Sequence, residues 1–378
     1  MGPKVPLFDL ALDEADVEAV AEVLRSGWLT MGPRTAEFEA AFAERLGVSH
    51  AVALNSATAA LHLAYRAAGI GPGDEVIVPA ITFVATAAAA RYCGATPVMA
   101  DVLGDHDLGL DPADVEARIT DRTRAVCLVH YGGYPAAAEE LRALCDARGI
   151  ALIEDAAHAP AGHVRAGGPA MGTVGLAGAF SFFSNKVLSC GEGGLLATSD
   201  DRVAELARRW RSHAMTSGTW DRHRGHATSY DVVDVGYNYR LDEPRAALLL
   251  SRLRGLDEAI ERRRALVRRY RERLAGVDGV MVPYEDAAVD LSACYVMPVL
   301  TADAEVRDRV RAEMLERHGV QTSVLYPAVH EFTAYFDETA PPLPRSERIA
   351  RAQITLPLYP HLSQESQDRV VDALRDAM

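Results

Sequence analysis

The first half of the chain alternates short apolar runs with stretches of helical period, from about residue 45 to residue 200. The apolar runs are rich in β-branched residues, and the intervening stretches are long enough to cross over a sheet as helices. We expect buried strands at residues 50–54, 75–79, 96–100, 125–129, 151–154, 178–183 and 194–198. The pattern therefore predicts an α/β fold, with a mostly parallel sheet flanked by helices.

The pattern changes near residue 250. A stretch rich in arginine and leucine over residues 252–275 has helical period and predicts a long connecting helix with a solvated, charged face. Fewer elements follow, with strands expected at 292–300, 320–325 and 354–358, and helices at 304–318 and from residue 364. We expect a large cofactor-binding domain over residues 1–250 and a smaller α+β domain over residues 251–378.

Charge and apolar content exclude several classes of partner. The formal net charge of −14 argues against nucleic acid, because binding to its backbone needs a basic surface. No apolar run reaches the roughly 20 residues of a membrane span. The start of the chain also lacks a basic region followed by a long apolar stretch, so we expect a cytoplasmic location. The five cysteines have no metal-ligand spacing, which favours reduced thiols and no metal site.

Lysine usage singles out one residue. Lys4 and Lys186 are the only lysines, and arginine supplies the other basic side chains. Arginine replaces lysine as a surface charge but cannot form an imine at neutral pH. Lys186 lies between the apolar Phe180–Phe183 run and the glycine-rich turn Gly191–Gly194. A lysine amine buried there would have a depressed pKa and could act as a nucleophile and proton carrier. The alternative is a lysine that extends from a strand edge into solvent.

Three other segments lie at predicted strand ends or helix starts. Residues 55–62 could cap a helix through Ser56 or Thr58, or bind a phosphate through free amides. Asp155, at the end of a buried strand, could be a metal ligand, a strand cap or the partner of a protonated pyridine nitrogen. No carboxylate or histidine cluster at metal spacing follows it, which disfavours the metal. Residues 234–243 could cap a helix, or reach a ligand or a partner subunit.

Together these segments resemble the DegT/DnrJ/EryC1/StrS family of sugar aminotransferases, over nearly the whole chain. The resemblance rests on five ordered segments, namely Gly71–Pro79, Thr82–Thr86, Glu154–His158, the Lys186 block and Gly236–Arg240. It implies an aspartate-aminotransferase-like fold of type I and pyridoxal 5'-phosphate as cofactor, with pyridoxamine phosphate formed during turnover. Some relatives carry histidine in place of the lysine and act as dehydratases, so Lys186 favours transamination.

The resemblance also implies roles for individual residues. Lys186 would hold the cofactor as a Schiff base and Asp155 would pair with the pyridine nitrogen, and these two are the expected catalytic residues. Further cofactor contacts would come from Phe83 on the ring face, His158 beside the phenolic oxygen, and Ala57, Thr58 and Ser181 at the phosphate. Asn238 and Arg240 would reach that phosphate from the neighbouring subunit of a homodimer with shared active sites. His213 and His330 are expected to contact substrate.

One departure from the family pattern concerns the phosphate segment. Ser56-Ala57-Thr58 stands where relatives usually have Ser-Gly-Thr. If the middle residue needed a positive φ, alanine would be strained there.

The implied reaction moves an amino group from glutamate or glutamine to a nucleotide-linked keto-sugar in amino-sugar natural-product biosynthesis, including antibiotics. An aminocyclitol aminotransferase and an aminohydroxybenzoate-synthase-like enzyme are alternatives within the same fold. A regulatory protein that binds the cofactor without turnover is an alternative of another class. A nicotinamide-dependent oxidoreductase would need a GxGxxG turn after an early strand, and residues 55–58 lack it.

Overall fold

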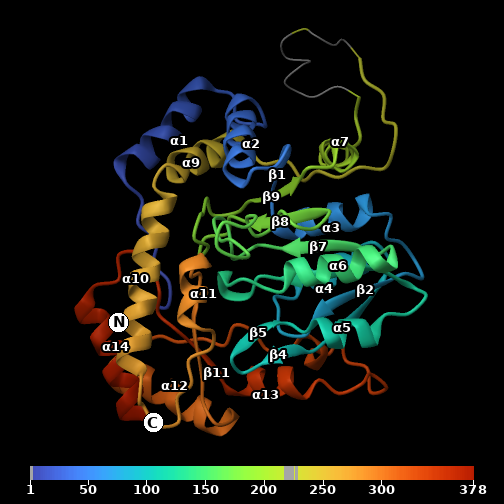
Figure 1. The fold of residues 1–378 in the computed structure, drawn as a ribbon. Coiled ribbons are helices and arrows are strands. Elements are labelled where there is room, and N and C mark those ends of the chain that lie inside the picture. Colours follow the sequence, from blue (N-terminus) through green and yellow to red (C-terminus); the bar gives the residue numbers. More distant parts are fainter. Residues whose placement is uncertain (1–2, 217–224, 226–228) are drawn as a thin grey trace.

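The computed structural model of the chain describes residues 3–216, 225 and 229–378. Its centre is a sheet of seven strands (Figure 1). In spatial order they are β1 (His50–Leu54), β9 (Gly194–Thr198), β8 (Ala177–Ser181), β7 (Ala151–Asp155), β6 (Thr123–Val129), β2 (Glu75–Pro79) and β3 (Thr96–Ala100). Only β9 runs antiparallel to its neighbours in this sheet. The predicted mostly parallel sheet is therefore confirmed.

Helices cover both faces of this sheet, so its strands are apolar on both sides. In β2, Val76 and Val78 belong to the core on one face, whereas Ile77 belongs to the core on the other. The first face is covered by α3 (Ala57–Ala67), α4 (Ala85–Tyr92) and α7 (Asp201–Trp210). The second is covered by α5 (Pro112–Arg118) and α6 (Ala138–Arg148).

Three more helices pack together beside β1. They are α1 (Glu14–Ser26), α2 (Pro33–Leu46) and α9 (Glu243–Leu253). A two-stranded hairpin, β4 (Val102–Gly104) and β5 (Asp107–Leu110), follows β3. A short 3-10 turn, η1 (Tyr131–Gly133), follows β6.

The C-terminal part of the chain is a smaller mixed assembly. Its elements are α10 (Leu256–Leu274), α11 (Asp286–Leu291), β10 (Met297–Leu300), α12 (Ala304–His318), η2 (Val329–Glu331), α13 (Pro344–Ala352), β11 (Gln353–Leu356) and α14 (Gln364–Ala377). β10 and β11 pair antiparallel. The predicted helices at 304–318 and from residue 364 are confirmed. The division into domains at residue 250 stays a proposal.

Three predictions for this part are wrong in detail. Of the strand expected over 292–300, only Met297–Leu300 forms β10. The helix expected over 252–275 is interrupted at Arg254 and Gly255, where α9 ends and α10 begins. The strand expected over 320–325 does not form a continuous ladder. Val320 bridges Val5 near the N-terminus, whereas Ser323 bridges Thr355 of β11, so the run divides its pairing between two segments.

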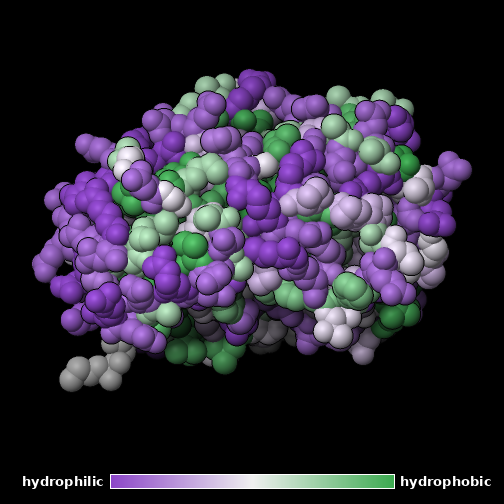
Figure 2. All heavy atoms as spheres, turned by 90° about the horizontal axis from the view of Figure 1, so that it is seen from below, coloured by the Kyte–Doolittle hydropathy of each residue, from purple (hydrophilic) through white to green (hydrophobic). Residues whose placement is uncertain are grey.

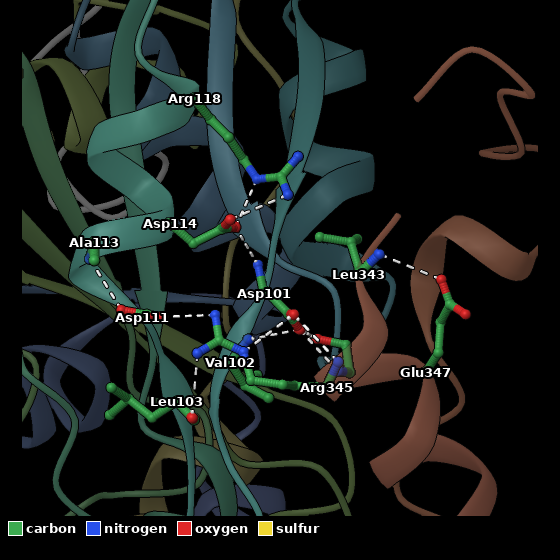
Figure 3. Close-up of polar contacts among 11 residues, drawn as sticks. Asp101, Val102, Leu103, Asp111, Ala113, Asp114, Arg118, Leu343, Arg345 and Glu347 are labelled. Atoms are coloured by element: carbon green, nitrogen blue, oxygen red, sulfur yellow. Dashed lines mark hydrogen bonds and ion pairs between the residues drawn. The ribbon is translucent and has the colours of Figure 1, made fainter. Parts of the chain in front are cut away.

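Buried polar contacts fix the C-terminal part against the edge of the sheet (Figure 3). Asp101, after β3, accepts hydrogen bonds from the backbone N–H and hydroxyl of Ser346 at 2.7 and 2.6 Å. Its other oxygen accepts from Arg345, whose guanidinium also lies 2.7 Å from Asp111. Because a buried carboxylate is costly without such donors, this cluster defines how α13 docks beside β4.

The outer face of the C-terminal part is mostly hydrophilic. Seen from below, small apolar groups are scattered among polar side chains (Figure 2). Among the described residues, no helix carries an apolar stretch long enough to cross a bilayer.

Candidate active site

A cavity of about 420 Å³ opens where the carboxyl ends of the parallel strands meet. Its walls come from the residues that follow β1, β2, β7 and β8, from the start of β9 and from the C-terminal part. Ligands of open α/β sheets bind at this edge. Seven of the residues proposed for the site line this cavity: Ala57, Thr58, Phe83, Asp155, His158, Ser181 and Lys186.

Lys186 lies in the turn between β8 and β9. The turn is fixed by hydrogen bonds from Lys186 N to Phe183 O and from Cys190 N to Phe182 O, both 2.9 Å. The residue as a whole is half-buried, but the protein around it removes the amine from water. Burial lowers the pKa of Lys186 to about 7 from 10.5, and the charge of Asp155 partly opposes this change. A large fraction of this amine is therefore unprotonated at neutral pH.

Asp155 ends β7 and is only 4 % exposed. One carboxylate oxygen accepts from the Thr86 hydroxyl at 2.8 Å, and the other accepts from Ala157 N at 3.1 Å. Burial raises the pKa of Asp155, whereas these hydrogen bonds and the charge of Lys186 lower it in part. A cation placed in the cavity against this carboxylate would stabilise its charged form.

The first turn of α3 forms another part of the cavity wall. Ser56 caps the helix by accepting from Ala59 N at 3.1 Å, and the amides of Ala57 and Thr58 have no acceptor within the helix. Such a turn binds phosphate through its amides and the helix dipole. Ala57 has helical, not left-handed, backbone, so the departure from Ser-Gly-Thr causes no strain.

Gly194, at the start of β9, allows that strand to lie against the phosphate turn. A Cβ atom at Gly194 would lie 2.1 Å from the carbonyl carbon of Ser56 and 2.4 Å from Ala57 N. No side chain fits between these backbones. This close approach keeps the first turn of α3 at the carboxyl edge of the sheet, where Ser181 at the end of β8 also lines the cavity.

His158 is buried, and its hydrogen bonds define its tautomer. Gly132 N donates to Nδ1 at 3.2 Å, so Nε2 carries the proton and faces the Tyr326 hydroxyl at 3.1 Å. Burial, and then the charge of Lys186, hold the pKa of His158 well below its usual value. His158 is therefore a neutral hydrogen-bond donor at neutral pH.

The remaining predicted residues lie outside this cavity. Asn238 is exposed, and its backbone oxygen accepts from Asn55 Nδ2 at 3.3 Å. Arg240 bridges Leu54 through its backbone and has a buried Nη1 without a hydrogen-bond partner. His213 is exposed, and His330 lies in η2 with Nε2 3.5 Å from Glu347. Their roles stay predictions.

Sequence reasoning missed several residues of the site. Thr86 supports Asp155 from α4, and Tyr295 and Tyr326 enter the cavity from the C-terminal part. Thr86 is the last residue of Thr82–Thr86, one of the five segments that resemble the family, and that segment could have indicated its role. Nothing in the local pattern around the two tyrosines distinguishes them from core residues.

The cavity fits pyridoxal phosphate by the chemistry of its donors. It combines a largely deprotonated amine, a buried carboxylate that lacks a full cationic partner and a helix start with open amides. Lys186, Asp155 and the Ala57–Thr58 turn would hold the aldehyde, the pyridine nitrogen and the phosphate. Among the described residues, no group of three or more His, Cys, Asp or Glu side chains could hold a metal ion.

Comparison with known proteins gives a consistent result. Residues 10–375 match the DegT/DnrJ/EryC1/StrS aminotransferase family. The dTDP-3-amino-3,4,6-trideoxy-alpha-D-glucose transaminase of Streptomyces venezuelae is 41% identical over 99% of this chain and 96% of its own length.

Two solved structures share the whole architecture. DesV of S. venezuelae is 40% identical with a TM-score of 0.90, covering 99% of this chain and 98% of that one. Spr1654 of Streptococcus pneumoniae, a putative sugar aminotransferase solved in a PLP form, is 28% identical with a TM-score of 0.88 and the same coverage.

The lowered pKa of Lys186 predicts a distinctive pH profile. In the full-length, cofactor-free chain, acetic anhydride should label Lys186 with a half-point near pH 7, because only the unprotonated amine reacts. Mass spectrometry of the peptide carrying Lys186 measures the label, and a Lys4→Arg background leaves this as the single lysine side chain. A half-point above pH 9 would show that the amine is solvated.

The close approach at Gly194 predicts a steric effect on cofactor binding. Gly194→Ala should weaken binding of pyridoxal phosphate by about tenfold or more, because displacing the turn removes hydrogen bonds to a charged group. An absorbance titration measures the affinity. Gly71→Ala is the control, since a Cβ there meets nothing within 4 Å. If the two variants bind equally well, the phosphate does not lie in this turn.

Proposed function

Because the chain belongs to the DegT/DnrJ/EryC1/StrS aminotransferase family, we propose that it transfers an amino group to a nucleotide-linked keto-sugar with pyridoxal phosphate as cofactor. The observation that carries this proposal is the Lys186 amine, with its pKa of about 7, in one cavity with the buried Asp155 carboxylate. The amine is matched to imine and proton-transfer chemistry at neutral pH.

When bound, the cofactor supplies a conjugated ring that delocalises negative charge from the amino-bearing carbon. Asp155 would hold the pyridine nitrogen in its protonated form, and the Thr86 hydroxyl orients the Asp155 carboxylate by donating to it. His158 donates from Nε2 as a neutral imidazole, so it adds no charge beside the amine.

With the cofactor bound, Lys186 Nζ is the group that would take up a proton from the amino-bearing carbon and give it back later in the transfer. A pKa near 7 suits both the uptake and the release of this proton, because the amine is then a usable base and its ammonium form a usable acid at neutral pH. The buried Tyr295 and the half-buried Tyr326 form walls of the cavity beside this amine.

The proposed acceptor is a keto-sugar carried on a nucleotide, and the proposed donor is glutamate or glutamine. Support comes from the 41% identical S. venezuelae relative, whose name describes a dTDP-linked amino sugar. We place the reaction in amino-sugar natural-product biosynthesis, including antibiotic pathways. A cytoplasmic location accords with five free cysteines, four of them buried, because unpaired thiols are typical of reducing compartments.

A panel of acceptors tests the proposed function. With glutamate or glutamine present, the protein should aminate at least one nucleotide-linked keto-sugar, detected by mass spectrometry of the product. Free keto-cyclitols are the control acceptors. Amination of a cyclitol alone would favour the aminocyclitol alternative, and failure of both donors to bleach the bound cofactor's visible band would rule out transamination.

The electron-sink role of Asp155 predicts a loss of turnover with the cofactor still attached. Asp155→Asn keeps the shape and removes the charge, so kcat should fall by about a hundredfold or more. Stopped-flow absorbance during the glutamate half-reaction measures the rate. Asp105→Asn, which breaks a partly exposed ion pair with Arg348, should retain the parent rate. Equal rates for both variants would contradict the role of Asp155.

We also propose a homodimer in which each active site draws on both subunits. The buried Nη1 of Arg240 has no hydrogen-bond partner, and the backbone of Arg240 bridges Leu54 at the end of β1, just before the proposed phosphate turn. Three exposed valines precede Arg240, and Val235 is 75% exposed. Apolar side chains uncovered in this way are typical of a protein interface.

Mixed dimers test the shared site. Lys186→Ala and Arg240→Ala chains should each be inactive alone, whereas co-expression should restore up to about a quarter of parent activity, because half of the dimers are hybrids with one intact site. Size-exclusion chromatography gives the oligomeric state of each preparation. Absence of any recovery in verified hybrid dimers would place Arg240 in its own subunit's site.

A further inference from the structure

The Lys186 amine rests on an aromatic ring. Nζ lies 4.4 Å from the centroid of the Tyr295 ring, and Tyr295 is 1% exposed. Among the described residues, no hydrogen bond or ion pair holds Nζ. An ammonium over a desolvated ring face is attracted by the ring's quadrupole. The ring is therefore the direct contact that locates this amine.

Aromatic neighbours hold the Tyr295 ring in place. His158 stacks on it with centroids 4.4 Å apart and an interplanar angle of 27°, and Phe8 stacks at 5.8 Å and 11°. Stacked rings at these separations restrict one another's rotation. The Tyr295 side chain is thus fixed from the loop after β7 and from the N-terminal arm, which we define as residues 5–9.

The N-terminal arm is anchored on both sides of Phe8. Val5 exchanges backbone hydrogen bonds of 3.1 and 3.0 Å with Gly319 and Gln321. After Phe8, the Asp9 carboxylate lies 2.9 Å from His361 Nε2. The arm therefore carries Phe8 to Tyr295 as part of the C-terminal assembly, although it is more than 280 residues away in sequence.

We propose that Tyr295 is a positioning residue for Lys186, and that the N-terminal arm holds the Tyr295 ring through Phe8. The proposal rests on the proposed function only in taking Lys186 as the cofactor's amine. During the part of the cycle when Nζ is free, its flexible four-carbon stem would allow many positions. The ring restricts Nζ to one of them, within reach of the cavity.

The ring, rather than the hydroxyl, carries this role. The charged or titratable groups that line the cavity with the amine are Asp155 from β7, His158 from the loop after it, Glu192 from the turn before β9, and the Tyr295 and Tyr326 hydroxyls from the C-terminal part. His158 is neutral, and burial raises the pKa of both tyrosines above their usual value. Asp155 is the charged group that raises the pKa of Lys186, and the Tyr295 ring face is the second feature that favours the ammonium form.

The labelling assay on the cofactor-free, full-length Lys4→Arg chain tests the proposal. Tyr295→Leu removes the ring but keeps an apolar side chain, so the labelling half-point of Lys186 should fall by about one pH unit. Tyr295→Phe keeps the ring and should leave the half-point within about 0.2 of the parent. Phe8→Leu should lower the half-point by less than Tyr295→Leu does, because the ring remains but is less restricted.

Two outcomes would overturn the proposal. One is an unchanged half-point in Tyr295→Leu; the other is an equal fall in Tyr295→Phe, which would assign the effect to the hydroxyl. Circular dichroism confirms that each variant is folded. If Tyr295→Leu does not fold, an unchanged half-point in Phe8→Leu overturns the role of the arm, and a shift in Tyr295→Phe overturns that of the ring. No sugar is present in this assay, so its result is independent of which acceptor the enzyme uses.

Discussion

The removal of one lysine amine from water, beside one buried carboxylate, is the constraint on which the site depends. Burial shifts the pKa of Lys186 downward and that of Asp155 upward, so each group is driven toward its neutral form. The two hydrogen bonds to Asp155 offset only part of its desolvation. A ligand that binds the amine covalently and brings a positive charge to the carboxylate would relieve both penalties. Pyridoxal phosphate does both, which is why this pair of side chains predicts it better than either residue alone.

The fold supplies this constraint through the convergence of strand ends. Asp155 and Ser181 end neighbouring parallel strands, and the turn after β1 joins them because Gly194 admits the antiparallel β9 between β1 and β8. The C-terminal part then closes the cavity. Tyr131 in η1 donates to Gln353 at 2.7 Å, and Gln353 donates to the backbone oxygen of Tyr326 at 2.9 Å. These bonds fix Tyr326, which lines the cavity, relative to the residues that follow β6. Asp101 holds α13 at the edge of the sheet (Figure 3).

The sequence predicts those parts of the structure that depend on neighbouring residues in the chain, such as the apolar strands. The boundaries of β1, β2, β3 and β9 agree with the apolar runs. In β2 and the antiparallel β9 every residue is buried, which requires a nearly continuous apolar sequence. Lys186 and Asp155 could be singled out because their chemistry is unusual where they stand. Tyr295 and Tyr326 could not, since they reach the cavity only through packing between segments more than 100 residues apart. The failed strand at 320–325 has the same origin, because its pairing depends on Val5 and Thr355.

Reductive trapping measures the central claim most directly. Treating the pyridoxal-phosphate-loaded protein with borohydride converts an imine to a stable secondary amine, which peptide mapping then locates. The account predicts one cofactor per chain on Lys186 and none on Lys4, the only other lysine. Label on Lys4, or a bound cofactor that dialyses away after reduction, would contradict it.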